Sequence, residues 1–564
     1  MKTKLEPFKS VAMALSGGGF RSAAFSLGTI SYVHRLKFSN GKRLSENIDF
    51  ISTTSGGSIT GMLYAVYLKK GMYMGESEYS FTRFEKKIRE VIEGEYILKR
   101  AFKELGSPVS SDGKSVNLIN AFSKVYGRFL FHDESFDIFI NPKYTYKVDV
   151  CFNSTEFETG NTFRFQSFDQ SFKSNSFGNR YIGIKDVRVA ADLKLGDILA
   201  SSSCFPGGFE PMLFPKDFCH DTLPYYILQE AISFKGDEML LGERKADFGL
   251  MDGGITDNQG LNSILRRDDS NKVDFDLVII NDVASPFMEG YTPPKESKGG
   301  FFSSLSPSGL KSFLLSVLVV LIGSGIFISM SDVNKLWLLL PAGILSGVIS
   351  GIWAFTSFVK YILTGNLVSE RNSGSWKKIF GNYKREFYKL KFSTLSQMIR
   401  ARISSILVLN NDVFLKQVRR LIYDKAYSQK EIVLDGDKIE VEVTSNKLIT
   451  NLVYNIAHDT KEHLPISEEL RAISKEAFEM ATTLWFSEKE RQNNLKEKLI
   501  ACGQFTACYN LYQYIQKLEK GMENESLEIS REDQKELSLF KLQIESDWAE
   551  FTSNPYFMEM VIGD

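Results

Sequence analysis

A serine in the first tenth of the chain stands in a context that favours nucleophilic chemistry. Ser55 lies in the stretch "IDFISTTSGGSITGMLYAVYL" (48–68), where an apolar strand is followed by small residues and then by an apolar helix. On a sharp strand-to-helix turn, a serine hydroxyl is pushed out of the sheet with a helix amino terminus behind it. The pattern G-x-S-x-G is met at Ser55 and Gly57, but Thr53 stands at the position of the first glycine. This half-match is weak by itself because serine and glycine are ordinary turn residues.

A serine hydroxyl is a poor nucleophile and needs a base within hydrogen-bond reach. The five histidines stand singly and in no metal-binding frame, so an acidic residue is the better candidate for the base. Asp252 in "GLMDGGITDNQGL" follows a short apolar stretch and precedes two glycines that let a carboxylate approach Ser55. An ordinary Asp-Gly-Gly turn is the alternative interpretation. The two residues are 197 positions apart in the sequence, a separation that only the fold closes.

A glycine-rich stretch near the amino terminus, "MALSGGGFRSAAFSLG" (13–28), indicates an anion pocket. A dinucleotide site is not expected because Ser22 stands where the pattern G-x-G-x-x-G requires its last glycine. A P-loop is not expected because no lysine follows the glycines. What remains is a strand, then backbone amides freed of side chains, then a helix start, which together can hold an anion. A tight turn without a ligand is the alternative.

Composition excludes several classes of function. The 564 residues include 43% hydrophobic residues, enough for a large core or for several domains. Lys and Arg number 68 against 69 Asp and Glu, so no basic field predicts a nucleic-acid partner. The five cysteines are odd in number and show no C-x-x-C spacing, which favours a reduced compartment without structural zinc. With no D-x-D-x-D-G calcium loop either, no metal and no cofactor is expected.

Two uncharged runs in the middle of the chain predict a membrane anchor. Residues Ser312 to Met330 form a run of 19, and Leu336 to Val359 add 24 more. Each run is long enough as a helix to cross a hydrocarbon core of about 30 Å, and the short break between them permits only a hairpin. Lysines flank the pair on both sides, which predicts a two-span membrane protein with its catalytic part on the cytoplasmic side. A hairpin buried inside a soluble protein is the alternative.

Three glycines in the second run predict a close helix contact. Gly343, Gly347 and Gly351 repeat every four residues and therefore share one helix face. The neighbour on that face would be either the first run or a second copy of the chain, which makes a homo-oligomer an expected alternative.

The three motifs G-G-G-x-R, S-x-G and D-G-G, in this order, resemble the patatin-like phospholipase family. Their wording is similar to the branch that includes cytosolic phospholipases and fungal lysophospholipases. The resemblance covers roughly Val11 to Ala284, with a weaker match near residues 499–511. Further blocks in family order are 148–160, 195–211 and 275–284. The chain departs from the family at two positions. Thr53 stands at the first glycine of the elbow, the strand-to-helix turn that carries the serine, where its side chain is expected to crowd the contact between strand and helix. Ser22 replaces a glycine that often follows the arginine.

The resemblance implies catalysis by a Ser-Asp dyad without histidine. Asp252 would take the proton of Ser55, and Ser55 would attack an ester of a membrane phospholipid or lysophospholipid to form an acyl-enzyme. The amides of Gly18 and Gly19, with help from Gly17 and Gly56, would hold the oxyanion. Arg21 would either bring positive charge to the oxyanion or lipid phosphate, or pin the loop by bonding carbonyls. Because a free aspartate has a pKa of about 3.9, the Asp252 carboxyl must be shielded from water to act as a base.

The resemblance also implies an α/β fold, a three-layer α/β/α patatin-like sandwich with a mainly parallel sheet. The two-helix hairpin predicted from the uncharged runs would interrupt it. The expected parts are a catalytic core over residues 1–300, the hairpin over 312–359, and a mostly helical part over 366–564 that packs back on the core. Within the last part, residues 393–427 have helical periodicity, 438–448 alternate like a strand, and 531–551 form a charged helix. Lys416, Arg419 and Arg420 give the first of these helices a basic face, either solvated or turned to anionic headgroups.

Two other functions stay open on the sequence. Thr53 favours a catalytically weak or inactive relative that serves as a membrane scaffold. Acyl transfer to another lipid or alcohol would use the same acyl-enzyme, and no sequence feature separates it from hydrolysis.

Overall fold

The structure of this chain is a computed structural model of all 564 residues. The described residues are 3–74, 77–93, 96–106, 113–167, 177–234, 247–269, 275–284, 304–330, 347–349, 351–354, 389–427, 430–434, 437–441, 447–461 and 463–560. The chain divides into two compact units. The first comprises Met1–Met288 and Asn411–Asp564, and the second comprises Glu289–Asn410.

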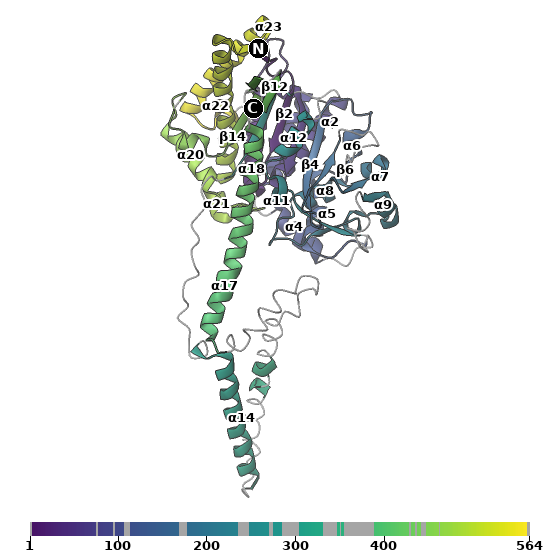
Figure 1. Cartoon of the computed structure of the whole chain (residues 1–564), viewed down its shortest axis with the longest axis vertical. Coiled ribbons are helices and arrows are strands. Elements are labelled where there is room, and N and C mark those ends of the chain that lie inside the picture. Colours follow the sequence, from purple (N-terminus) through teal and green to yellow (C-terminus); the bar gives the residue numbers. More distant parts are fainter. Residues whose placement is uncertain are drawn as a thin grey trace. The chain divides into compact units, whose positions relative to one another are not determined.

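The first unit is built on a mixed sheet, which has eleven strands in the described part of the chain (Figure 1). Five neighbouring strands run parallel in the order β14, β11, β2, β3 and β4. Beyond β4 the pairing is antiparallel, through β5, β6, β7 and β9, and β10 pairs with both β4 and β8. The bounds are β2 Val11–Leu15, β3 Ile48–Thr54, β4 Asp149–Glu156, β5 Thr162–Gln166, β6 Phe177–Gly178, β7 Ile182–Ile184, β8 Met212–Phe214, β9 Ile232–Phe234, β10 Phe248–Asp252, β11 Leu277–Asp282 and β14 Leu448–Leu452.

Helices cover both faces of the parallel part, as the alternation of side chains along β2 requires. Met13 and Leu15 point into a large core that includes α1 (Gly19–Arg35), α2 (Gly56–Met74) and α22 (Leu495–Glu523). Ala12 and Ala14 point the other way, into a smaller core with α12 (Leu261–Asp269) and α18 (Leu415–Tyr427). Successive strand residues face opposite sides, so a strand buried on both faces reads as a continuous apolar run such as "VAMAL". The predicted α/β sandwich is therefore confirmed, with a sheet that is parallel only over its five central and edge strands.

The remaining helices of the first unit surround this sandwich. On the α2 side they are α3 Ser77–Val91, α4 Tyr96–Leu105, α5 Leu118–Leu130, α6 Asp137–Ile140, α7 Val187–Ala191, α8 Leu195–Ser202 and α9 Tyr225–Ala231. The carboxy-terminal helices are α19 Asn455–His458, α20 Glu468–Glu479, α21 Glu488–Gln492, α23 Arg531–Ser553 and α24 Phe557–Met560. A short helix, α11 (Gly254–Asp257), directly follows β10 and packs against α18.

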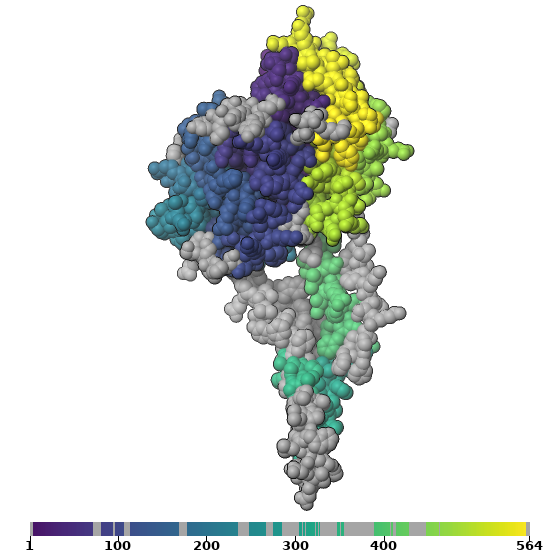
Figure 2. All heavy atoms as spheres, turned by 180° about the vertical axis from the view of Figure 1, so that it is seen from behind, coloured from purple at the N-terminus to yellow at the C-terminus, as the bar shows by residue number. Residues whose placement is uncertain are grey.

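The two ends of the chain meet in the first unit. Strand β1 (Thr3–Lys4) pairs in parallel with β15 (Leu527–Glu528), and the long helix α22 lies along α1. A side chain on Gly28 of α1 would collide with the backbone of Ile500 on α22, so the two helices approach closely where glycine stands. Figure 2 shows the carboxy-terminal residues in yellow against the amino-terminal residues in purple.

The second unit corrects the prediction of a membrane anchor. Its first uncharged run forms α14 (Pro307–Met330), and of the second run only 347–349 and 351–354 are described. A span requires one continuous apolar helix of about 20 residues. In the part of the chain that the structure describes, no helix is both long and apolar enough to cross a membrane. The prediction of a two-span membrane protein with a cytoplasmic catalytic part, which rested on the two uncharged runs and the lysines beside them, is therefore wrong.

The glycine face predicted for the second run is only partly described. Gly343 lies outside the described residues, and a Cβ on Gly347 or Gly351 would meet no atom within 4 Å. A contact between copies through these glycines stays a prediction.

The secondary-structure predictions for the later chain agree with the structure wherever their residues are described. The helical stretch 393–427 forms α17 (Phe392–Val408) and α18, joined by a π-helical turn at Leu409–Phe414. The expected strand forms β13 (Asp437–Val441), which pairs with β12 (Lys430–Leu434), while residues 442–446 lie outside the described part. The expected charged helix is α23.

Candidate active site

Ser55 occupies a tight turn between β3 and α2. Its backbone is in the left-handed region, with φ of +51°, and its side chain is almost fully buried. The two following glycines allow this turn to approach the neighbouring loop. A Cβ on Gly56 would lie 2.1 Å from the carbonyl oxygen of Gly19, and one on Gly57 would lie 2.4 Å from that of Leu15. Only glycine fits at these two positions, which is why the sequence marks this turn so clearly.

Thr53, the departure from the family's elbow pattern, fits because a glycine stands opposite it. Its γ-methyl group is 2.4 Å from where a Cβ of Gly61 would be, so the helix leaves space for the threonine. The Thr53 hydroxyl and the Ser58 hydroxyl are hydrogen-bonded at 2.8 Å. The expected crowding between strand and helix is therefore absent at this position, and Thr53 gives no support to an inactive scaffold.

Asp252 ends β10, and its side chain meets Ser55. Its Oδ1 accepts the Gly254 N–H at 2.7 Å. The Ser55 side chain lies near enough to this carboxylate to lower its pKa. Burial raises the pKa of Asp252 to about 6, because a charged carboxylate loses its hydration there, although Ser55 and the Gly254 N–H oppose the shift. The shielding that the sequence argument required is thus supplied by the protein itself.

Activity is expected to fall on the acid side of pH 6. The base must be unprotonated, so protonation of Asp252 below its pKa of about 6 removes it. The nearby Cys204 thiol stays neutral because burial raises its pKa, and it adds no charge in this range. We expect kcat/KM to drop about tenfold per pH unit below pH 6, which forms the acid limb of the pH–rate profile. The check is a pH–rate profile with a soluble ester, and a limb near pH 4 would contradict the burial argument.

The glycine loop and the elbow, which approach each other closely at Gly19 and Gly56, leave three backbone amides without an acceptor among the described residues. Gly19 and Gly56 are the first residues of α1 and α2, where N–H groups have no partner within the helix. Together with Gly18, these amides have no acceptor among the residues that the structure describes. Two helix amino termini therefore meet beside Ser55, and both favour negative charge.

The neighbouring amides are already used. The N–H of Gly17 donates to the Asn258 carbonyl at 2.8 Å, and the Phe20 N–H donates to the Thr483 carbonyl at 2.7 Å. The prediction had included Gly17 as a helper of the oxyanion, but its amide has this other partner. Asn258 was missed by the sequence argument because it follows the Asp-Gly-Gly motif without any pattern of its own.

Arg21 bonds the carboxy-terminal part of the chain. Its guanidinium donates to the carbonyls of Met480 at 2.6 Å and Phe478 at 3.0 Å, and to the Thr482 hydroxyl at 3.4 Å. Burial lowers its pKa to about 10, so it stays charged. Of the two roles left open by the sequence, these contacts favour pinning of the loop by carbonyls.

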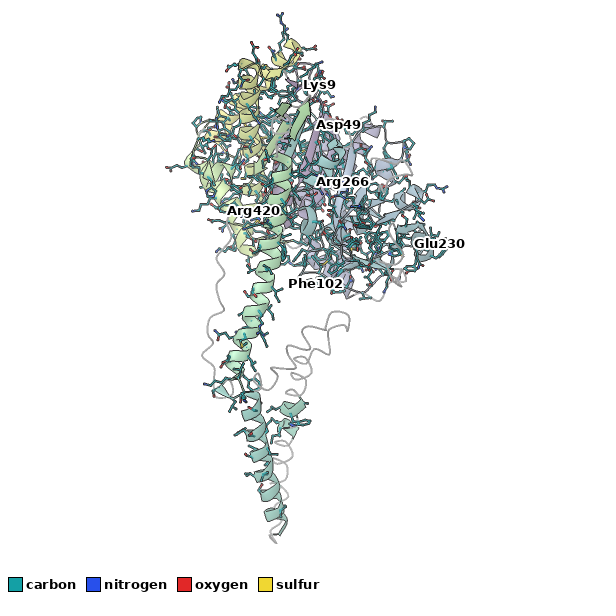
Figure 3. The ribbon with its side chains drawn as sticks, in the orientation of Figure 1. Lys9, Asp49, Phe102, Glu230, Arg266 and Arg420 are labelled. Carbon is teal, nitrogen blue, oxygen red and sulfur yellow. The ribbon has the colours of Figure 1, made fainter. Side chains whose placement is uncertain are left out.

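We expect Arg21→Lys to lower the thermal midpoint of unfolding by about 5 °C. The single ammonium group of lysine cannot donate to all three acceptors that the planar guanidinium of Arg21 reaches. Activity should fall by the same factor on a phospholipid ester and on a neutral monoacylglycerol. A loss confined to the phosphate-bearing lipid would show instead that Arg21 binds phosphate. Arg420→Lys, on the exposed face of α18 (Figure 3), is the matched control and should change neither quantity.

The arginines of the predicted basic face of α18 do not all point to solvent. Arg420 is exposed, whereas Arg419 turns inward and pairs with the buried Asp282 at 3.1 Å. Tyr423 donates to the same carboxylate at 3.0 Å. These contacts fix α18 beside the end of β11, so Arg419 is not part of a surface for anionic headgroups.

The comparison with known proteins agrees with this geometry. Residues 13–264 match the family described as patatin-like phospholipase, a span that contains the glycine loop, Ser55 and Asp252. No curated protein matches the chain. The match leaves out the carboxy-terminal residues that Arg21 and the glycine loop contact. Residues 13–264 of this chain are therefore a patatin-like phospholipase domain, and the chain is an enzyme, a serine esterase that acts on lipids.

Proposed function

We propose that this enzyme hydrolyses acyl esters of phospholipids or lysophospholipids through an acyl-enzyme on Ser55. The observation that carries the proposal is that the fold places the buried Ser55 and Asp252 together: Ser202 accepts the Ser55 N–H through its hydroxyl and the Gly253 N–H through its carbonyl, and Ser55 lowers the pKa of the Asp252 carboxyl. A carboxylate with a pKa raised to about 6 is a better base than an exposed one and is still ionised at neutral pH.

In the proposed reaction, Asp252 takes the Ser55 proton as the serine oxygen attacks the ester carbonyl. The amides of Gly18, Gly19 and Gly56 donate to the oxyanion, and Gly17 is left out because its N–H already has an acceptor. Asp252 then gives the proton to the leaving alcohol. Water attacks the acyl-enzyme with the same carboxyl as base, which releases the fatty acid and restores the dyad.

The test is fatty-acid release from mixed phospholipid liposomes by the purified full-length enzyme, with Ser55→Ala as background. Adding a monoacylglycerol acceptor separates hydrolysis from acyl transfer, since transfer would give diacylglycerol at the expense of free fatty acid. Hydrolysis predicts free acid in both assays. Release no greater than that of Ser55→Ala would contradict the proposal and favour the inactive scaffold.

A further inference from the structure

A third serine lies between the two proposed catalytic residues. Ser202 is the last residue of α8, and its side chain is fully buried. Its Oγ accepts the backbone N–H of Ser55 at 3.1 Å and donates to the carbonyl oxygen of Asn153 at 2.7 Å. The same Oγ lies 2.9 Å from the hydroxyl of Ser58, in the first turn of α2.

These contacts fix the direction of a short chain of hydroxyl groups. Ser202 has one proton, and the Asn153 carbonyl can only accept, so Ser202 donates there. Ser58 must then donate to Ser202, and Thr53 must donate to Ser58. This series of hydrogen bonds thus begins at Thr53 on β3, passes through Ser58 on α2 and Ser202 on α8, and ends at Asn153 on β4. The backbone N–H of Ser55 joins it at Ser202.

Residues 202–204, at the end of α8, also hold the backbone around Asp252, the proposed base. The N–H of Asp252 donates to the carbonyl of Cys204 at 3.0 Å, and that of Gly253 donates to the carbonyl of Ser202 at 3.3 Å. The Ser202 hydroxyl therefore accepts the backbone N–H of Ser55, and the Ser202 carbonyl accepts the backbone N–H of Gly253, the residue after Asp252. One short segment connects two residues that are 197 positions apart in the sequence.

The conformation of Ser55 explains why such a support is needed. A residue other than glycine in the left-handed region is strained and persists only where its surroundings hold it. The strained backbone is held on both sides: the Ser55 carbonyl accepts the Ser58 N–H at 2.9 Å within the elbow, and the Ser55 N–H donates to Ser202 on another helix. Without the bond to Ser202, the elbow can relax and carry the hydroxyl away from Asp252.

We propose that Ser202 is a positioning residue of this enzyme, whose hydroxyl holds the Ser55 backbone so that the Ser55 side chain reaches Asp252. The inference rests on the proposed function because it assigns Ser202 a part in that same reaction. It places the nucleophile's support outside the three motifs, in the block at 195–211.

The test compares Ser202→Ala with the matched control Ser201→Ala in the full-length enzyme. Ser201 is also fully buried on α8, and its hydroxyl bonds the Ile198 carbonyl and the Ser154 hydroxyl but not the elbow. Active sites are counted by labelling with a fluorophosphonate, so that misfolded protein does not enter kcat. Hydrolysis of p-nitrophenyl butyrate then gives kcat, KM and the acid limb for each variant.

We expect Ser202→Ala to lower kcat per labelled site about 30-fold with KM within about twofold, because the buried Ser55 N–H loses its acceptor. The acid limb should move to higher pH, since the influence of the Ser55 side chain, which lowers the pKa of Asp252, is weakened. Ser201→Ala should keep the limb and most of the kcat. A lower thermal midpoint in both variants would not by itself produce these differences.

Two results would overturn the inference. One is a kcat for Ser202→Ala within about twofold of the control, and the other is an unchanged acid limb, which would assign Ser202 a structural role only. If the wild-type enzyme is no more active than Ser55→Ala, the proposed function fails instead. The rate of fluorophosphonate labelling of Ser55 then tests the support separately, and an equal rate in both alanine variants would contradict it.

Discussion

Ser55→Ala is expected to lower kcat for ester hydrolysis by about 10⁴-fold or more, since no acyl-enzyme can form without its oxygen. The oxyanion donors are unaffected by the substitution, because the amides of Gly18, Gly19 and Gly56 do not bond the Ser55 side chain. KM should therefore change little. The measurement is fatty-acid release together with the burst of p-nitrophenol in the first turnover, and the burst should vanish.

Ser55→Gly separates chemistry from stability at the same position. Ser55 has φ of +51°, a conformation that glycine adopts without strain. We expect this variant to be as inactive as Ser55→Ala but more stable than the wild type by about 1 kcal/mol. Residual activity in either variant above about 1% of wild type would contradict the assignment of Ser55 as the nucleophile.

The second large effect is expected for Asp252→Asn, with a fall in kcat of about 10³-fold to 10⁴-fold. Asparagine keeps the shape of the side chain and can still accept the Gly254 N–H, but it cannot take a proton from Ser55. The acid limb of the pH profile should disappear with the base. The check is the residual rate between pH 5 and pH 9, which should be nearly flat.

The same substitution is expected to stabilise the protein at neutral pH. Burial raises the pKa of Asp252 from 3.8 to about 6, so the folded state holds this proton more tightly than the unfolded chain. Stability from this group is present at low pH and is lost as pH rises from about 4 through 6, a penalty of order 3 kcal/mol. Asparagine carries no such penalty, so its thermal midpoint should exceed that of the wild type at pH 8 and approach it near pH 4.

Asp257→Asn is the matched control for this pair of effects. Asp257 is fully buried, and burial raises its pKa to about 6 as well, but its carboxylate bonds the Asn262 N–H and does not contact Ser55. We expect it to gain stability at pH 8 in the same way while keeping most of the activity. If both variants lost activity equally, the loss would reflect a buried charge rather than a base.

Close backbone approaches at glycines made part of the site predictable. The elbow and the glycine loop can exist only with glycine, since a Cβ on Gly56, Gly57 or Gly19 would lie within 2.4 Å of a backbone oxygen. Such positions appear as a pattern in the sequence wherever the turn occurs. The candidates Ser55 and Asp252 follow from these patterns, and their roles in catalysis remain our proposal.

Partners that are distant in the chain were not predictable. Arg21 bonds residues more than 450 positions away, and the N–H of Gly17 is taken by Asn258, which no motif marks. Thr53 appeared to crowd the elbow because its compensation, Gly61, lies on the next helix rather than on the strand. Each of these depends on which surfaces the folded sheet brings together.

The sequence by itself determined the α/β class, the patatin-like motifs and the two residues proposed for the dyad, because tight turns restrict residue type at neighbouring positions. Counting uncharged residues wrongly predicted membrane spans, because no helix in the part of the chain that the structure describes is long and apolar enough to cross a membrane. Only the tertiary structure decided how the site is held. The parallel strands β2 and β3 bring the glycine loop and Ser55 to one edge of the sheet, and α8 connects the elbow to Asp252. These contacts depend on chain closure over hundreds of residues, which no local pattern specifies.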